Sequence, residues 1–196
     1  MFTGLVRYQG KFRGWRKNRT ELLLEVPEEL AGQLEPGQSL AVDGVCLTLS
    51  RQEKNQLLFT LSRETLDRTN LKDYRPGKTV NLELPLRLAD FLGGHLVTGH
   101  VDSTGQVIEV KSRPPGKRLK IKVPAESRKY LVDKGSVAVN GVSLTVAALG
   151  PDWLEVELIP ATLQATNLND LRPGDRVNLE GDIIGKYVYN FLSKKF

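Results

Sequence analysis

The sequence predicts an all-β protein of two tandem small β-barrels related by internal duplication, followed by a C-terminal α-helix. Three observations lead to this prediction. The chain contains a long internal repeat, each copy carries short apolar runs bounded by tight turns, and the last stretch is amphipathic without a counterpart in the first copy. The 196 residues are enough for two domains of about 100 residues, the common size for a single core.

The repeat becomes visible when the chain is aligned with itself. Residues 39–49 match residues 136–146 at seven of 11 positions, and residues 64–83 match residues 161–180 at 13 of 20. The register of the match shifts near the start, so the second copy carries two extra residues within 105–123. Two copies at this long period indicate a duplicated domain, because a solenoid needs at least three short repeats.

Within each copy, apolar residues form runs of strand length. The expected strands cover residues 22–26, 57–61, 119–123 and 154–158. The turn signals are Pro36-Gly37, Asp43-Gly44, Arg75-Pro76-Gly77, Asn140-Gly141 and Arg172-Pro173-Gly174. Asp-Gly and Asn-Gly favour tight turns because glycine takes positive φ freely and Asp or Asn tolerates it. Several short strands at this spacing favour a closed barrel, which has no exposed edge.

Helices are expected at three places. Residues 27–30 and 124–127 each predict one short helix, so that each copy has one, opened by proline in the first turn. From Ile183 onward apolar residues recur three or four positions apart, which predicts an amphipathic helix with Asp182 as its N-cap. Such a helix of about three turns is marginal alone and must pack on something. Its own barrels and the same helix of other subunits are both open as partners.

Composition excludes several classes of protein. No run of about 18 apolar residues exists, so no transmembrane helix is predicted, and residues 1–6 lack the features of a signal peptide. Cys46 is the single cysteine, which excludes an intrachain disulfide and fits the reducing cytoplasm, where we expect the protein. The net charge of +5 is modest and the basic residues are scattered, which argues against nucleic-acid binding.

The sequence contains no pattern of metal ligands, no nucleophile elbow and no nucleotide-binding glycine loop. Residues 93–100, Gly-Gly-His-Leu-Val-Thr-Gly-His, form the most unusual segment, and alone they are better interpreted as a glycine-rich linker between domains. A duplicated domain usually duplicates its ligand site, so positions where the copies differ within matching surroundings are informative. Those pairs are Cys46 and Ser143, Leu5 and His100, Pro85 and Asp182, and Phe2 and Val97.

These differing positions include a thiol, a hydroxyl, an imidazole and a carboxylate, which suit nucleophilic attack or proton transfer. Each also has a structural interpretation, which is favoured for each residue alone. Cys46 can be a small buried hydrophobic residue, Ser143 a strand residue, His100 part of a turn and Asp182 a helix cap. Together they predict two matched binding sites whose chemical tasks have diverged, and the matching segments are interpreted as the shared part of those sites.

Several motifs occur in a fixed order along the chain. They are Met-Phe-Thr-Gly at residues 1–4, Asp-Gly-Val-Cys-Leu-Thr at 43–48, Gly-Gly-His at 93–95 running into Gly-His-Val-Asp at 99–102, Asn-Gly-Val-Ser-Leu-Thr at 140–145, and the paired segments 64–66 and 160–163. This combination resembles the riboflavin synthase family over essentially the whole chain. The resemblance implies two six-stranded Greek-key barrels, at residues 1–88 and 89–181, and a trimerisation helix at residues 182–196.

The resemblance also implies an activity. Two molecules of 6,7-dimethyl-8-ribityllumazine exchange a four-carbon unit, which gives riboflavin and 5-amino-6-(ribitylamino)uracil in the final step of riboflavin biosynthesis. One molecule loses a proton from its acidic 7-methyl group, and the other adds a nucleophile at C7. No metal or organic cofactor and no nucleic-acid or membrane partner is implied. The implied active site lies between the N-terminal barrel of one subunit and the C-terminal barrel of a neighbour in a homotrimer, and association with lumazine synthase is left open.

Site residues follow from the resemblance by position. A first pocket would use Gly4, Leu5, Val6, Cys46, Leu47, Thr48, Thr60, Leu61, Ser62, Arg63, Glu64 and Thr65. A second pocket would use Gly99, His100, Val101, Ser143, Leu144, Thr145, Glu157, Leu158, Ile159, Pro160, Ala161 and Thr162, with Lys134 from another subunit. The candidate catalytic residues are Phe2, Ser39, Cys46, His100, Ser143, Thr145 and Asp182. We assign His100 and Ser143 with Thr145 to deprotonation of the methyl group, and Cys46, Ser39 and Asp182 to the addition at C7.

Two alternatives belong to other functional classes. Lumazine-binding fluorescent antenna proteins resemble this chain in their duplicated fold and bind a lumazine or flavin without converting it. They are expected to lose one pocket or the reactive groups, and both pockets look intact here, so the enzyme is favoured. A nucleic-acid-binding pair of barrels would need a basic face with stacking aromatic residues, and only 7% of the residues are aromatic.

Overall fold

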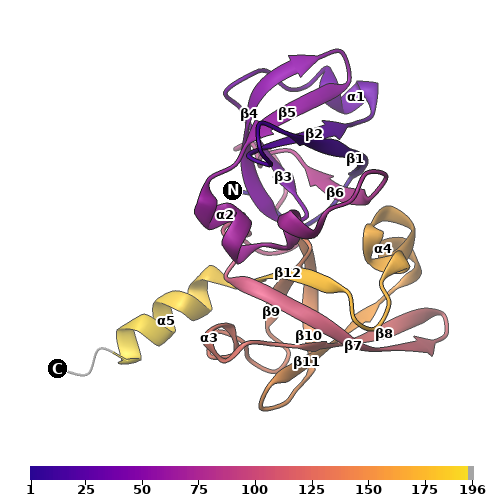
Figure 1. Ribbon diagram of the computed structural model, residues 1–196. Coiled ribbons are helices and arrows are strands. Elements are labelled where there is room, and N and C mark those ends of the chain that lie inside the picture. The colour runs from indigo at the N-terminus through magenta and orange to yellow at the C-terminus, as the bar shows by residue number, and fades with distance from the viewer. Residues whose placement is uncertain (194–196) are drawn as a thin grey trace.

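The computed structural model describes residues 1–193 and contains two closed β-barrels of six strands each (Figure 1). The first barrel consists of β1 (Tyr8–Arg16), β2 (Glu21–Glu25), β3 (Ser39–Val42), β4 (Val45–Glu53), β5 (Gln56–Thr60) and β6 (Thr79–Glu83). The second consists of β7 (Ser103–Arg113), β8 (Gly116–Lys122), β9 (Ser136–Val139), β10 (Val142–Leu149), β11 (Trp153–Leu158) and β12 (Arg176–Gly181). Both barrels have the same cyclic order, β1-β2-β5-β4-β3-β6 and β7-β8-β11-β10-β9-β12. The predicted fold of two Greek-key barrels is confirmed.

The four predicted strands are present as β2, β5, β8 and β11. Alternate residues along each strand fill the barrel, because successive side chains point to opposite faces. Each barrel has its own core, with Phe12 and Phe59 fully buried in the first and Ile121 and Val156 in the second. Two separate cores agree with the prediction of two domains, while the boundaries at residues 88 and 181 stay predictions.

The two extra residues of the second copy lie in the hairpin between β7 and β8. In this hairpin Arg113 pairs with Gly116 across the short tip Pro114-Pro115. In the first barrel, Arg16 pairs with Glu21 across the longer tip at residues 17–20. The second hairpin is therefore longer in its paired part and shorter in its loop.

Short helices connect the strands. The first barrel carries α1 (Glu28–Ala31), α2 (Arg63–Arg68) and the 3-10 helix η1 (Asn70–Asp73), and the second carries α3 (Ala125–Arg128), α4 (Pro160–Ala165) and η2 (Asn167–Asp170). The prediction of one short helix per copy is wrong in number, although α1 and α3 lie where it placed them. The pattern missed α2 and α4 because six residues make too few turns to show a helical period, and neither helix buries a side chain.

The two barrels meet through their equivalent tight turns. Asp43-Gly44 joins β3 to β4 and Asn140-Gly141 joins β9 to β10, with all four residues at positive φ. A Cβ on Gly44 would lie 2.6 Å from the backbone nitrogen of Gly141, and a Cβ on Gly141 would lie 2.6 Å from that of Gly44. The glycines therefore meet two needs, since the turn requires positive φ and the contact leaves no room for a side chain.

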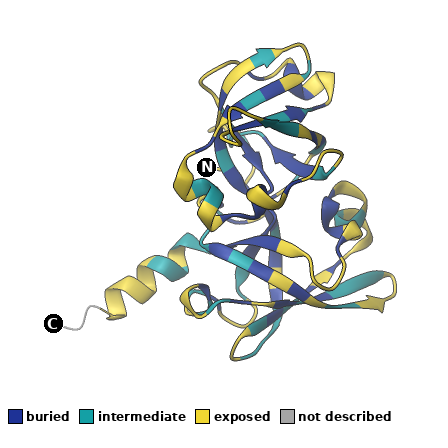
Figure 2. Cartoon of the chain, viewed as in Figure 1, coloured by how far each residue is buried: buried dark blue, intermediate teal, exposed yellow. Residues whose placement is uncertain are grey.

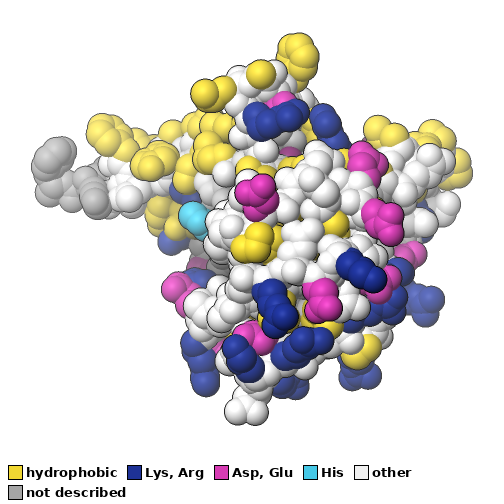
Figure 3. Space-filling view, turned by 90° about the horizontal axis from the view of Figure 1, so that it is seen from above, with side chains coloured by type: hydrophobic (Ala, Val, Ile, Leu, Met, Phe, Trp, Pro, Cys, Tyr) yellow, Lys and Arg dark blue, Asp and Glu magenta, His cyan; other side chains and the backbone are white. Residues whose placement is uncertain are grey.

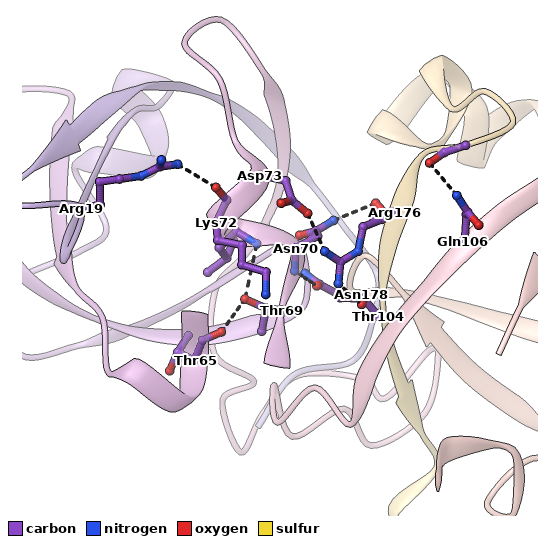
Figure 4. A network of polar contacts seen from close by, with 12 residues as sticks. Arg19, Thr65, Thr69, Asn70, Lys72, Asp73, Thr104, Gln106, Arg176 and Asn178 are labelled. Carbon is purple, nitrogen blue, oxygen red and sulfur yellow. Dashed lines mark hydrogen bonds and ion pairs between the residues drawn. The ribbon is translucent and has the colours of Figure 1, made fainter. Parts of the chain in front are cut away.

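Asparagines around these turns connect the barrels. Asn70, at the start of η1, donates its backbone N–H to Oδ1 of Asn178 in β12 (2.8 Å), and Asn167, at the start of η2, donates the equivalent bond to Asn81 in β6 (2.7 Å). Figure 4 shows Asn70 and Asn178 close together between the barrels. Residues 64–83 and 161–180, which match in the repeat, thus supply hydrogen bonds between the barrels.

Asp43 takes the place that Asn140 has in the second copy. Its buried carboxylate accepts hydrogen bonds from the hydroxyl of Tyr74, from the backbone N–H of Asn81 (2.7 Å) and from Nδ2 of Asn167 (2.8 Å). Burial raises the pKa of the Asp43 carboxyl above its usual value, although the three donors act in the opposite direction. The contact between the barrels therefore contains a group whose protonation is linked to folding.

Replacing Asp43 with asparagine is expected to remove one source of pH dependence from stability. A carboxyl whose pKa is raised by folding contributes fully to stability below its unfolded pKa, and this contribution is lost as the pH rises through the folded pKa. From about pH 4 upward, the free energy of unfolding of the wild type should therefore fall relative to that of Asp43→Asn. Urea unfolding of both proteins across this range measures the difference, and a difference that does not change with pH would contradict the prediction.

Helix α5 (Ile183–Ser193) projects from the second barrel and is largely exposed (Figures 1 and 2). Its first turns are attached to the barrel, because Lys186 forms an ion pair with Asp102 (2.5 Å) and Tyr189 contacts the ring of Tyr130 edge-on. Hydrophobic side chains gather along the projecting part in Figure 3. They are Ile184, Tyr187, Val188, Phe191 and Leu192. The amphipathic helix is confirmed, and residues 194–196 of the predicted helical segment lie outside the described residues.

Candidate active site

The segments that lead into the two barrels pair with each other. The N–H of Phe2 donates to the carbonyl of Val97 (2.7 Å), and the N–H of Val97 donates to the carbonyl of Phe2 (3.1 Å). The two residues are equivalent in the repeat, so this pairing relates the barrels by an approximate twofold axis. Both side chains are buried there against Ala41 and Ala138.

The first leading segment, residues 2–6, contacts both barrels. Glu83 of β6 accepts hydrogen bonds from the N–H of Thr3 (2.7 Å) and of Gly4 (3.0 Å), which fastens the segment to its own barrel. The carbonyl of Gly4 accepts from the N–H of Ser143 in β10 (2.8 Å), and Val6 packs on the core of the second barrel. Residues 4–6 therefore lie beside the strand of the other copy.

The second leading segment repeats this arrangement. Glu180 of β12 accepts from the N–H of Thr98 (2.7 Å) and of Gly99 (3.0 Å). The carbonyl of Gly99 accepts from the N–H of Cys46 in β4 (2.9 Å), and Val101 packs on the core of the first barrel. The leading segments are thus exchanged between the two barrels.

This exchange corrects the predicted composition of the two pockets. The sequence-based grouping placed residues 4–6 with 46–48, and residues 99–101 with 143–145. The structure places residues 99–101 beside Cys46 and residues 4–6 beside Ser143. An alignment of the copies finds equivalent segments, but the barrel against which a segment packs is a tertiary property. We name the resulting sets the Cys46 site (residues 46–48, 60–65 and 99–101) and the Ser143 site (residues 143–145, 157–162 and 4–6).

Alternation along the strands decides which side chains a ligand could reach. Cys46 and Ser143 are half-buried, and Thr48 and Thr145 are exposed, so these pairs face away from the cores. The predicted binding residues whose side chains point into the cores are Leu47, Leu61, Leu144 and Leu158. These four leucines therefore offer a ligand only their backbone groups.

The end of β5 lies beside β4 on the exposed face of the Cys46 site. Ser50 lies on that face, two positions beyond Thr48, and its hydroxyl bonds Oγ1 of Thr60 (3.0 Å) and the N–H of Thr60 (3.1 Å). Residues 60–65 then enter α2, where Ser62 caps the helix by accepting from the N–H of Thr65 (3.1 Å). The equivalent residues 157–162 lead from β11 into α4 at the Ser143 site.

The candidate catalytic residues differ in accessibility. Phe2 is fully buried between the barrels, so its ring contacts protein atoms. Ser39 opens β3 opposite Thr48 and lines a groove of about 650 Å³, with Leu5 and Pro85 on its other sides. Asp182 accepts from the N–H of Ile184 (3.0 Å), which confirms it as the cap of α5.

For His100 and Lys134, the sequence predicted contacts that their neighbours within this chain do not provide. His100 is exposed and belongs to the Cys46 site, so within one chain it does not share a site with Ser143. The two can act together only if the sites of different subunits meet. Lys134 is exposed and its ammonium donates to the carbonyl of Ala147 (3.1 Å), and its reach into another subunit stays a prediction.

The imidazole that contacts Ser143 within the chain is that of His95, which the sequence-based reasoning missed. Nδ1 of His95 lies 2.7 Å from Oγ of Ser143. The N–H of His95 donates to the carbonyl of Thr3 (3.2 Å), and Gly94 has no room for a Cβ, which would lie 2.2 Å from that carbonyl oxygen. Residues 93–95 therefore pack closely against Thr3 and Ser143 and also link the two domains. The signal that could have found His95 is the Gly-Gly pair before it, because two glycines permit close backbone approach.

Burial controls the protonation of His95. The residue is 7% exposed, and this burial lowers the pKa of its imidazole, while the negative charge of Asp182 acts in the opposite direction. Burial therefore favours the neutral ring, which has one nitrogen free to accept a proton. Among residues 1–193 no group of three or more His, Cys, Asp and Glu side chains could hold a metal ion.

Comparison with known proteins identifies the family. The family model of the lumazine binding domain matches the chain twice, at residues 3–85 and 98–182. The chain is 42% identical to the riboflavin synthase of Mycobacterium bovis over 198 residues, which cover 98% of each protein. The chain belongs to the riboflavin synthase family.

Other members of the riboflavin synthase family match over a similar extent. Identity is 36% to the riboflavin synthase of Bacillus subtilis, covering 99% of this chain and 91% of that protein, and 35% to that of Actinobacillus pleuropneumoniae, covering 100% and 91%. Among solved structures, LumP complexed with riboflavin matches with a TM-score of 0.85 and 23% identity, covering 92% of this chain and 99% of that one. LumP complexed with 6,7-dimethyl-8-ribityllumazine matches with a TM-score of 0.82 and 24% identity, covering 92% and 98%. At such identities the two structures support the fold alone.

None of the helices within residues 1–193 is long and apolar enough to cross a bilayer.

Proposed function

We propose that the chain catalyses the riboflavin synthase reaction, in which one 6,7-dimethyl-8-ribityllumazine molecule donates a four-carbon unit to another. Donor and acceptor are the same compound, so two similar sites suit the reaction. The observation that carries the proposal is a pair of equivalent sites with different reactive groups, a thiol at Cys46 and a hydroxyl at Ser143. The match to riboflavin synthases over nearly the full chain supports the same reaction.

The chemistry asks the protein mainly for placement and proton transfer. The lumazine ring delocalises the carbanion that forms when its 7-methyl group loses a proton. Orienting two bound molecules can lower such a barrier by roughly 7–11 kcal/mol. Backbone groups of residues 46–48 and 143–145 suit the pyrimidinedione edge of the ring. Polar residues such as Thr48 and Thr145, which face outward, suit the ribityl hydroxyls.

The proposed active site combines the Cys46 site of one subunit with the Ser143 site of another. This arrangement would bring His100 and Ser143 together, as the assignment to methyl deprotonation requires. Helix α5 is the proposed contact of a homotrimer, and its exposed apolar residues support this, because a cluster of exposed hydrophobic side chains marks an interaction surface. Association with lumazine synthase and a cytoplasmic location stay predictions.

One assay tests the proposed function directly. Purified protein is mixed with 6,7-dimethyl-8-ribityllumazine and a metal chelator, and riboflavin is followed by its fluorescence while light scattering gives the mass of the assembly. We expect one riboflavin for every two lumazines consumed, with the chelator having no effect. The result that would overturn the proposal is tight lumazine binding without riboflavin, because an antenna protein would behave in this way.

A further inference from the structure

His95 and Ser143 form a polar pair in which His95 is buried and Ser143 is half-buried. The two side chains come from different parts of the chain, residues 93–95 between the barrels and strand β10, and are joined by the 2.7 Å contact between Nδ1 and Oγ. Two glycines make the approach possible. Gly94 lies so close to Ser143 that a Cβ on it would be 3.0 Å from Oγ, and the carbonyl of Gly4 holds the N–H of Ser143 on the other side (2.8 Å).

The second nitrogen of His95 has no protein partner. Nε2 is buried, and no group within residues 1–193 forms a hydrogen bond with it. An unpaired buried polar atom destabilises the folded state, so its presence in a folded protein calls for an explanation. A structural histidine would be expected to use both nitrogens, whereas a histidine kept as a proton acceptor needs only Nδ1 paired with the group that it serves.

We propose that His95 is the positioning residue for Ser143, whose hydroxyl proton it accepts while Oγ takes a proton from the bound substrate. This inference rests on the proposed function for its substrate. The C–H bond of the lumazine 7-methyl group breaks, its proton goes to Oγ of Ser143, and the hydroxyl proton of Ser143 goes to Nδ1 of His95. The electron pair stays on the lumazine ring, and the same protons return along this path at the end of the cycle.

The electrostatic surroundings of His95 agree with this role. The ring becomes positive when it takes the proton, and Asp182 supplies the negative charge that favours this form. Glu83, which holds the segment that His95 pairs with, accepts the N–H groups of Thr3 and Gly4. A buried positive charge without a negative partner is costly. We therefore expect the charge of Asp182 to act on the reaction through His95, in addition to the role of Asp182 as the cap of α5.

The decisive experiment is a double-mutant cycle with His95→Asn and Ser143→Ala. Asparagine keeps a polar atom near the position of Nδ1 but cannot take a proton. We expect His95→Asn to lower kcat by about 10²-fold, the lower end of what acid–base groups contribute, with the Kd for 6,7-dimethyl-8-ribityllumazine nearly unchanged. In the Ser143→Ala background His95→Asn should have no further effect, because His95 acts only through Ser143. Additive losses, or an unchanged kcat in the single variant, would overturn the inference.

A second readout does not depend on turnover. NMR titration follows the imidazoles of the wild type and of Ser143→Ala, and the chain has two histidines, so His100→Gln assigns the signals. We expect the His95 signal to titrate below the usual value of about 6.5 and to shift when Ser143 loses its hydroxyl. In the kinetic assay, the fall of kcat toward acid pH in the wild type should be absent in His95→Asn. If the wild type forms no riboflavin, the proposed function is wrong. If the His95 titration is the same in the wild type and in Ser143→Ala, the pairing of His95 with Ser143 is wrong. The second test remains valid even if His95→Asn does not fold.

Discussion

Replacing Gly4 with alanine is expected to abolish riboflavin formation and to lower stability. Gly4 has φ of +75°, and an added Cβ would lie 2.6 Å from Cβ and 2.8 Å from the backbone nitrogen of Ser143. A left-handed backbone costs a residue with a Cβ about 1–2 kcal/mol, and overpacking costs a further 1–3 kcal/mol or so. Ser143 must move, and the hydrogen bond between its N–H and the carbonyl of Gly4 (2.8 Å) must stretch or break.

The measurement is thermal unfolding together with the lumazine assay. A loss of about 3 kcal/mol would lower Tm by roughly 6–12 °C in a chain of this size. Gly37→Ala is the matched control, because Gly37 also has positive φ (+93°) but nothing within 4 Å of an added Cβ. It should lower Tm by only a few degrees and leave the activity near that of the wild type. If both variants behave alike, backbone strain accounts for the effect and the close packing of Gly4 on Ser143 is unimportant.

Replacing Asp182 with asparagine is expected to lower turnover by about 10²-fold with little loss of stability. Asparagine is as good an N-cap as aspartate, so the bond to the N–H of Ile184 (3.0 Å) can persist. The variant loses the negative charge that favours protonated His95. This loss removes electrostatic stabilisation from the step in which His95 takes up a proton. Steady-state kinetics corrected for the folded fraction, beside thermal unfolding, separates the two effects.

Asp182→Ala completes this comparison. Alanine removes both the cap and the charge, so it should show the same loss of turnover as asparagine and an additional loss of about 1 kcal/mol in stability. Normal turnover per folded molecule in Asp182→Asn, together with a destabilised Asp182→Ala, would mean that Asp182 is only the cap of α5. Comparing Asp182→Asn with Asp182→Ala therefore separates the effect of the Asp182 charge on turnover from its effect on stability as a helix cap.

Much of the fold could be predicted from local sequence. The Asp43-Gly44 and Asn140-Gly141 dipeptides form the predicted turns, because positive φ at adjacent positions is a property of those residues themselves. The amphipathic stretch after Asp182 forms the predicted helix, because its 11 residues are enough to show the helical period. The short helices α2 and α4 could not be predicted, because each spans six residues and buries no side chain.

Within the site, the sequence determined which residues are equivalent, and only the tertiary structure decided which of them meet. The self-alignment found Cys46 with Ser143 and Leu5 with His100, because divergence within matching surroundings is visible in one dimension. It could not show that the leading segments are exchanged, since both arrangements have the same sequence and differ only in the barrel on which Val6 and Val101 pack.

His95 illustrates the same limit from the other side. Its hydrogen bond to Ser143 joins residues 48 positions apart in the sequence. This contact requires both strand β10, which carries Ser143, and the close approach of Gly94 to Thr3. By itself the sequence determined two barrels, two sites and the residue types that could react. The tertiary structure decided the partner of each reactive group, because hydrogen bonds between distant segments depend on how the barrels pack and not on the spacing of residues along the chain.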